Sequence, residues 1–481
     1  MAPSSIEKEI PIQEQQGKPK AAPDGLPAPR RSYAAATVIG AIGLTVLDAS
    51  SVNVGLPAIA ASLEASAAEI VWIANVYSLT VLTLLLPLSA AAERIGFTRM
   101  FVAGIVLFLL AACVAAASTN MAMLMLARIG QGIGAATVSC LFGGLVRNIY
   151  PAHLLARGIS INAMVIGFAA VLGPVIGAAV LSVASWRWLF LMNLPVGLIA
   201  MLGVRYLPIP PTIRSRFDLP GAVLSMTTLG MFVVGLDSLA AAPGRAAALM
   251  LAAFVLGVFV VRRSRAQPAP LVPVDLLARP VIGFAVLASA LMFAAQMGTA
   301  VALPFFFLHV LERQYLEIGV LLGGWPIGGA LMAPVAARLS DRYSAALLCA
   351  IGAAVMGLAM TALLLTTAQT HSAWLLLWTA FAGVGFGFFQ TPNNRAMLSA
   401  APRERSGAAG GLQATTRVFG QSVGIAGVGV AFGLSDTVGP YLALGVAILC
   451  ALLAVVVNVI RVRNDARRGC GVRIAQHRKS S

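Results

Sequence analysis

Asp48 is a carboxylate in the middle of an apolar stretch of the chain. On insertion scales a charge at the centre of a membrane helix costs about 2.5–3.5 kcal/mol, so such a residue faces other helices or a water-filled cavity. A carboxyl group held there beside a cation can take up and release a proton. We therefore predict that Asp48 couples proton movement to the movement of a solute, or contacts that solute. The alternative is a structural ion pair that orders the helices.

Arg128 is the predicted partner of Asp48. In the helices expected below, Arg128 and Asp48 lie about 10 Å and about 12 Å from the same membrane face, at a rise of 1.5 Å per residue. A guanidinium does not give up its proton in proteins, so its part would be to pair with the acid or polarise it. A fixed clamp between helices is the alternative.

Further polar side chains in the apolar segments are predicted to line a cavity between the helices, namely Ser51, Asn53, Asn75, Tyr77, Gln131, Gln296, Gln390, Asn393 and Arg417. Such a mixture with aliphatic and aromatic residues suits amphipathic organic solutes, and one embedded acid near aromatic rings suits a lipophilic cation. Hydrogen bonding between neighbouring helices is the alternative for most of them. Arg417 has two open interpretations, a second cavity cation or an interfacial anchor, and Asp237 is expected at the membrane interface.

These residues require long apolar elements, and the composition provides them. Of the 481 residues, 59% are hydrophobic and 10% charged, whereas soluble domains carry about 25% charged residues. A helix of about 20 apolar residues crosses a hydrocarbon core about 30 Å thick. The sequence predicts an all-α integral membrane protein with fourteen transmembrane helices, at 33–56, 69–92, 98–117, 121–146, 158–183, 188–206, 218–240, 246–261, 280–308, 316–337, 344–366, 373–392, 406–433 and 439–460.

The basic residues are distributed unevenly between the loops. With the N-terminus inside, nearly all of the 33 Lys and Arg residues fall in inside loops and tails, and only Arg187, Arg245 and Arg313 fall outside. This excess on one side is the pattern expected of cytoplasmic loops, and it favours an even number of helices with both termini cytoplasmic. Nucleic-acid binders instead cluster their basic residues on one folded face, so the net charge of +16 does not indicate a nucleic-acid partner.

An acid–arginine pair recurs after the second and the tenth predicted helix, as Glu93–Arg94 and Asp341–Arg342. This repeat predicts two six-helix bundles with an extra helix pair between them, and duplicated bundles around a midplane site are a frequent transporter plan. The predicted organisation is a disordered cytoplasmic tail at 1–32, a first bundle at 33–206, an inserted pair with cytoplasmic linkers at 207–279, a second bundle at 280–460 and a basic cytoplasmic tail at 461–481.

Four stretches of the chain resemble the major facilitator superfamily, and specifically its fourteen-helix drug:proton antiporters. They are Leu47-Asp48 with Val52-Asn53-Val54-Gly55-Leu56-Pro57 and Ile59, then Trp72 followed by Tyr77-Ser78-Leu79, then Arg128-Ile129-Gly130-Gln131-Gly132 with Gly134, and finally Trp186-Arg187-Trp188 with Phe190, Asn193, Pro195 and Gly197. The helix 5 antiporter signature is also kept at Gly173-Pro174-Val175-Ile176-Gly177, although Ala169 and Ala178 stand where glycines are usual.

The resemblance implies roles for several of these residues. Asp48 and Arg128 would take part in proton coupling, and Gly173, Pro174 and Gly177 would kink helix 5 and let it pack closely. The loop residues Glu93, Arg94, Gly96, Asp341 and Arg342 would latch the inner gate, for which positive-inside anchoring is the alternative reading. The first of these loops has lost the initial glycine and the leucine of the family pattern.

The function predicted from these features is proton-coupled export of hydrophobic, cationic drugs or biocides by alternating access, by a monomer in a bacterial inner membrane. Export of an endogenous metabolite and a channel are the alternatives. Enzyme chemistry is not expected, because the four histidines form no metal-like cluster and no phosphate-binding loop is present. The predicted partners are the lipid bilayer, protons and a small-molecule solute. No cofactor or metal is expected, and the five cysteines have no metal-ligand spacing.

Overall fold

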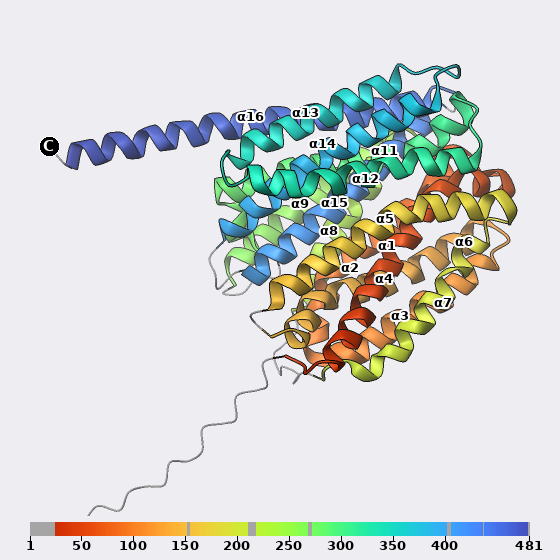
Figure 1. Ribbon diagram of the computed structural model, residues 1–481, viewed down its shortest axis with the longest axis horizontal. Helices are drawn as coiled ribbons and strands as arrows, with labels where there is room; N and C mark the ends of the chain where they lie inside the picture. Colours follow the sequence, from red (N-terminus) through yellow and green to blue (C-terminus); the bar gives the residue numbers. More distant parts are fainter. Residues whose placement is uncertain are drawn as a thin grey trace, which may run out of the picture.

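The computed structural model describes residues 25–151, 154–209, 218–267, 272–401, 406–435 and 437–479, and these are folded almost entirely into helices (Figure 1). The N-terminal bundle comprises α1 (Arg30–Leu63), α2 (Ala67–Ile95), α3 (Phe97–Ala116), α4 (Met121–Ile149), α5 (Leu155–Val183), α6 (Trp188–Leu191), α7 (Asn193–Gly203) and the 3-10 turn η2 (Val204–Tyr206). A helix pair follows, α8 (Leu219–Asp237) and α9 (Pro243–Arg265). The C-terminal bundle comprises α10 (Val274–Leu277), α11 (Pro280–Phe305) with its π-helical end η3 (Phe306–Val310), α12 (Tyr315–Leu339), α13 (Ala345–Leu364), α14 (Ser372–Ser399), α15 (Ser406–Leu434) and α16 (Gly439–Lys479).

The helices have the length and composition needed to cross a bilayer. Within the described residues, thirteen helical segments meet both requirements, with α6, α7 and η2 together forming one of them. Helix α5 adds a shorter apolar segment, Phe168–Val183. Large apolar side chains on the outside are exposed, for example Leu126 at 69% and Leu358 at 71%, as expected when lipid rather than water surrounds the helices. The protein is therefore a multi-pass membrane protein, and the number fourteen stays a prediction.

The two bundles lie side by side, with α1–α7 coloured red to yellow and α11–α16 green to blue in Figure 1. They meet along two pairs of helices, α5 against α12 and α2 against α15. Helices α8 and α9 pack against each other, and α8 also contacts α2 and α15. The inserted pair therefore touches both bundles.

The bundles share an apolar core at one end. We call the end that holds the start of α1 and the terminal part of α16 the terminal end, and the opposite one the far end. A cluster of buried apolar residues at the far end combines both bundles, and we call it the far-end cluster; its members include Leu56, Ile59, Ile70, Val71, Phe306, Ile318, Val428 and Phe432. Two other large clusters each lie inside a single bundle. Near the terminal end, a Cβ added to Gly40 of α1 or to Gly410 and Gly411 of α15 would meet no atom within 4 Å.

Several predicted boundaries are wrong. Helix α1 begins at Arg30 and continues through Pro57 to Leu63, so residues 30–32 are not part of a disordered tail; residues 1–24 lie outside the described part of the chain. The predicted span 188–206, in contrast, is confirmed as one membrane-length segment, Trp188–Tyr206, with a turn at Met192 between α6 and α7. Helix α16 continues to Lys479 rather than ending near 460, because charged residues end the apolar segment without ending a helix.

The start of α8 is held by Asp218, whose side chain caps the helix by accepting a hydrogen bond from the backbone N–H of Gly221. Arg263 of α9 pairs with the same carboxylate at 2.7 Å, and Gln267 donates to it at 2.9 Å. The hydrogen bonds from Arg263 and Gln267 lower the pKa of Asp218 to about 2. These contacts tie the two helices of the inserted pair together at the terminal end.

Candidate functional site

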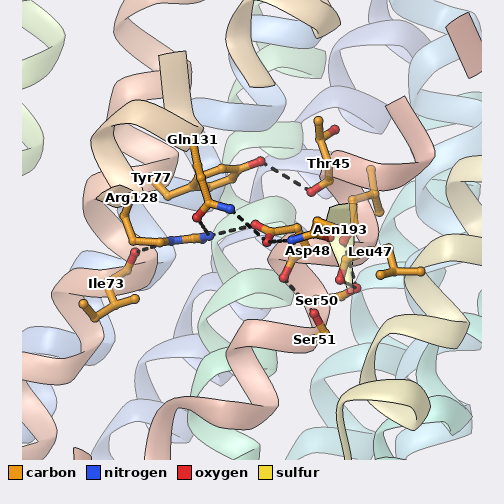
Figure 2. Close-up of polar contacts among 11 residues, drawn as sticks. Thr45, Leu47, Asp48, Ser50, Ser51, Ile73, Tyr77, Arg128, Gln131 and Asn193 are labelled. Atoms are coloured by element: carbon orange, nitrogen blue, oxygen red, sulfur yellow. Dashed lines mark hydrogen bonds and ion pairs between the residues drawn. The ribbon is translucent and has the colours of Figure 1, made fainter. Parts of the chain in front are cut away.

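Asp48 lies at the centre of a buried hydrogen-bond network that joins α1, α4 and α7 (Figure 2). Its Oδ2 pairs with Nη1 of Arg128 at 2.7 Å, and both side chains are essentially unexposed, at 0% and 1%. Its Oδ1 accepts hydrogen bonds from Asn193 at 2.6 Å and from Gln131 at 3.3 Å. Both carboxylate oxygens are therefore satisfied by donors. The structure brings together the two residues that the sequence predicted as partners.

Arg128 has further contacts that fix its guanidinium against α2. Its Nε donates to the backbone carbonyl of Ile73 at 3.3 Å, and its Nη1 also donates to Oε1 of Gln131 at 2.9 Å. The centre of the guanidinium lies 4.2 Å from the centroid of the Tyr77 ring, and the Tyr77 hydroxyl donates to the backbone carbonyl of Thr45 at 3.4 Å. A desolvated cation over an aromatic face is an attractive contact of about 2 kcal/mol.

Local sequence explains how these side chains come into reach. An added Cβ on Gly132 of α4 would lie 2.7 Å from Cβ of Thr80 on α2, and one on Gly134 would lie 2.6 Å from the carbonyl oxygen of Gly104 on α3. The absence of side chains there lets α4 pack closely on both neighbours. Asn193 is the first residue of α7, and its side-chain amide reaches Asp48 from there.

The helix 5 signature lies against α1, next to the Asp48 network. A Cβ on Gly173 would lie 1.8 Å from Oγ of Ser50, and one on Gly177 would lie 3.0 Å from the backbone oxygen of Ser51. Pro174 lies inside α5 between them. The close approach predicted for these glycines is therefore present.

The predicted lining residues lie in different settings. Ser51 is buried and its hydroxyl donates to the backbone carbonyl of Asp48. Asn53 of α1 donates to Sδ of Met297 on α11 at 3.7 Å, a contact between the two bundles. Asn75 is fully buried, and neither polar atom of its side chain has a partner among the described residues. On α11, Oε1 of Gln296 is likewise buried without a described partner. Gln390 lies partly buried on α14.

Arg417 and Asn393 occupy different positions in the C-terminal bundle. Arg417 of α15 is partly buried, lies within electrostatic range of Tyr77 across the bundle boundary, and forms no ion pair with any described residue. This placement favours the cavity interpretation over the interfacial one. Asn393 is fully buried inside its own bundle, where it donates to the backbone carbonyl of Ala285 and accepts a hydrogen bond from Arg461 at 3.1 Å.

Two residues of these networks were not among the predicted site residues. Asn193 was noticed only as part of a motif, although its amide makes the shortest bond to Asp48. Arg461 is 3% exposed but falls one residue beyond the predicted end of the last span, so it was counted with the tail. Its sequence signal is an arginine directly after a long segment that is apolar except for Asn458.

The predicted gating residues lie at the terminal end: Glu93 and Arg94 in the last turn of α2, Gly96 directly after it, and Asp341 and Arg342 in the turn that follows α12. Gly96 separates α2 from α3 with a φ of 105°, a conformation that favours glycine. Arg94 donates to the backbone carbonyl of Ala90, while the side chain of Glu93 lies outside the described part. Asp341 pairs at 2.6 Å with Arg395 of α14, and Arg342 is exposed next to it. In this structure Asp341 therefore holds α14 within its own bundle.

The chain matches known membrane transport proteins over most of its length. The family described as "Major Facilitator Superfamily" matches residues 38–425. The chain is 39% identical over 456 residues to the "Uncharacterized transporter YebQ" of Escherichia coli (strain K12), which covers 94% of this chain and 100% of that protein. It is 32% identical over 399 residues to the "Cephamycin export protein CmcT" of Amycolatopsis lactamdurans, covering 80% and 81%.

The fold is similar to that of solved transporter structures. A POT family transporter crystallised with a thioalcohol-conjugated peptide superposes with a TM-score of 0.68, covering 90% of this chain and 96% of that one, at 16% sequence identity. At this identity the likeness concerns the fold alone.

Proposed function

Because the chain belongs to the major facilitator superfamily of transporters, we propose that it is a proton-coupled antiporter that exports hydrophobic drugs or biocides by alternating access. The proposal specifies the fourteen-helix drug:proton antiporter type and a monomer in a bacterial inner membrane, with both termini in the cytoplasm. The terminal end then faces the cytoplasm and the far end faces the outside. The positive-inside distribution of Arg and Lys supports this orientation.

The observation that carries the proposal is the buried Asp48–Arg128 pair. Two charges removed from water are costly to keep, and a pair of this kind is stable only with good geometry and additional hydrogen bonds. Here Gln131 and Asn193 provide those bonds. Protonation of Asp48 would cancel its charge and release Arg128, which changes the contacts between α1, α4 and α2. One proton can thus alter the packing of helices at the centre of the transporter.

The closed far end supports alternating access in the proposal. The far-end cluster joins both bundles, whereas the two other large clusters of buried apolar residues each lie inside a single bundle. A transporter in this state would receive its solute from the cytoplasm. Opening it to the outside requires the far-end cluster to separate, and proton entry would drive the return.

The charge of the solute is the least constrained part of the proposal. A cationic solute was expected because Asp48 is an embedded acid, but in this state both of its oxygens are hydrogen-bonded and its side chain is fully buried. Arg417, in contrast, is a cation without an ion-pair partner among the described residues. The solute screen must therefore include cationic, neutral and anionic compounds, and endogenous metabolites for the alternative function.

The test is transport in everted membrane vesicles with an imposed pH gradient, acidic inside. We expect wild-type protein to accumulate at least one compound of the screen and an uncoupler to stop this accumulation. Asp48→Asn should lose proton-driven accumulation when transport is expressed per amount of transporter in the membrane, because its lost ion pair also lowers its stability. Asp218→Asn is the matched control and should transport normally, because Asp218 lies at the terminal end of the inserted pair. Flux that survives the uncoupler would indicate a channel, and normal active transport by Asp48→Asn would refute the coupling role.

A further inference from the structure

Asp237 is a second acid that lies where three parts of the protein meet. It is the last residue of α8, and α8 packs against α2 of the N-terminal bundle and α15 of the C-terminal bundle. The side chain of Trp72 of α2 lies near its carboxylate. Its Oδ1 is buried and has no hydrogen-bond partner among the described residues. A Cβ on Gly429 of α15 would lie 2.5 Å from this oxygen, so the missing side chain of Gly429 makes room for the carboxylate.

This position lies at the edge of the far-end cluster. Val71, the neighbour of Trp72, belongs to that cluster, and so do Val428 and Phe432 of α15. When the far end opens, α2 and α15 must move apart, and Asp237 then gains access to water on that side. The environment of its carboxylate therefore differs between the closed and the open far end.

The two environments favour different protonation states. A buried carboxylate oxygen without a donor is unfavourable when charged, whereas water stabilises the charge after opening. The neutral acid removes this buried charge. Closing the far end around Asp237 is therefore linked to uptake of a proton from the water on that side.

Other charged groups on the packed elements do not contact Asp237. On α2, Glu69 is exposed and its carboxylate accepts bonds from Ser66. On α9, Arg245 is exposed near the helix start. On α15 the nearest charged residue toward the helix interior is Arg417, about 18 Å along the helix from Gly429. Asp436, in the following loop, lies outside the described residues.

We propose that Asp237 is a proton-binding residue that latches the far end, so that acidity on that side holds the transporter closed there. The inserted helix pair thereby takes part in gating, because its last residue in α8 bridges α2 and α15. The physiological direction of this effect rests on the proposed export function. In an exporter, an acidic exterior would favour the state that receives solute from the cytoplasm.

The test measures how accessible the far end is at different pH values. Full-length protein with its native cysteines replaced by serine and with Ile318→Cys as reporter is labelled in vesicles with a membrane-impermeant maleimide added from the far side. Ile318 is 0% exposed in the closed cluster. Leu316→Cys, on an exposed position of the same helix, corrects for the pH dependence of the thiol reaction. We expect the corrected labelling rate to rise between pH 6 and pH 8, by at most about tenfold per pH unit for one proton.

Three variants decide the outcome. Asp237→Asn, which mimics the neutral acid, should label slowly at both pH values, and Asp237→Glu should retain a pH response. Asp48→Asn should also retain it, because the reporter does not require transport. The proposal is overturned if wild-type labelling does not change with pH, if Asp237→Asn keeps the wild-type response, or if Asp48→Asn abolishes the response. A failure of Asp48→Asn to lose active transport would instead count against the antiport function alone.

Discussion

The central ion pair can be tested by a double-mutant cycle on Asp48 and Arg128. Arg128→Gln leaves the carboxylate with only the neutral amides of Gln131 and Asn193 as donors. Asp48→Asn leaves a guanidinium that is 1% exposed without a counter-charge. The double variant removes both charges, so neither remains buried alone.

The expected magnitudes follow from the burial of the pair. Breaking a buried ion pair by removing one partner costs about 3–5 kcal/mol of unfolding free energy, because an uncompensated charge remains. The double variant should lose less than the sum of the single variants, and the difference should approach about 3 kcal/mol, the upper part of the range for residues in direct contact. The hydrogen bonds to Gln131 and Asn193 persist in part with amide side chains, which reduces the cost of the double change.

The assay is chemical or thermal unfolding of the purified full-length protein in a mild detergent, with all four members of the cycle measured together. The matched control is the Arg313–Glu317 pair, which is 18% and 31% exposed and should show a coupling energy below about 1 kcal/mol. A coupling energy between Asp48 and Arg128 no larger than that of the control would refute the reasoning that burial makes this pair strong.

Three further predictions concern the helix contacts and the inserted pair. Gly319→Leu should reduce transport strongly and raise labelling of far-end cysteines, since even a Cβ there would lie 2.4 Å from Cβ of Ala178 and keep α12 away from α5. Gly429→Ala should lower the unfolding free energy by about 1 kcal/mol or less, measured by thermal unfolding, because its Cβ would lie 2.5 Å from Oδ1 of Asp237 and only the end of that side chain has to rotate away. The hydrogen bond from Arg263 of α9 lowers the pKa of Asp218 from 3.8 to about 2. The charged carboxylate should therefore stabilise the protein above pH 4, and this contribution should be lost as the pH falls toward 2. The unfolding free energy measured at pH 2–5 should depend less on pH in Asp218→Asn than in the wild type.

The pairing of Asp48 with Arg128 could be predicted because charge is rare in apolar helices and the two residues had matching depths. Depth follows from counting residues along a helix, and a buried charge must find a partner. The close packing at Gly173 and Gly177 was implied by the family resemblance. Thirteen spans among the described residues could be predicted because apolar length is visible in the sequence, whereas the full span at 158–183 stays a prediction.

The remaining contacts depend on breaks and on packing angles that the sequence does not specify. Asn193 is the first residue of α7, and its amide reaches Asp48 because α7 packs beside α1, which the residue pattern does not specify. Arg461 was predicted to lie in the cytoplasmic tail because it directly follows the predicted last span, 439–460. Its long side chain nevertheless reaches back to Asn393. Asp341 was predicted as a latch residue from its loop motif alone. Its partner Arg395 could not be predicted, because the distance between the two side chains depends on how α14 packs on α12.

Helix α2 provides a physical connection between the central pair and the far end. Arg128 holds it at two points, through the carbonyl of Ile73 and the ring of Tyr77. Trp72, one residue before Ile73, lies near Asp237 at the seam with α15. The central pair and the latch therefore meet one helix, while the pH response of the far end depends on the acid at Asp237. Tyr77→Phe keeps the ring over Arg128 and loses only the bond to Thr45, so it should leave the far-end labelling response intact. Tyr77→Ala removes the ring contact between α2 and Arg128, and it should raise labelling at every pH value while the pH response persists, because Asp237 is unchanged; loss of the response in Tyr77→Ala would contradict this separation of the two acids.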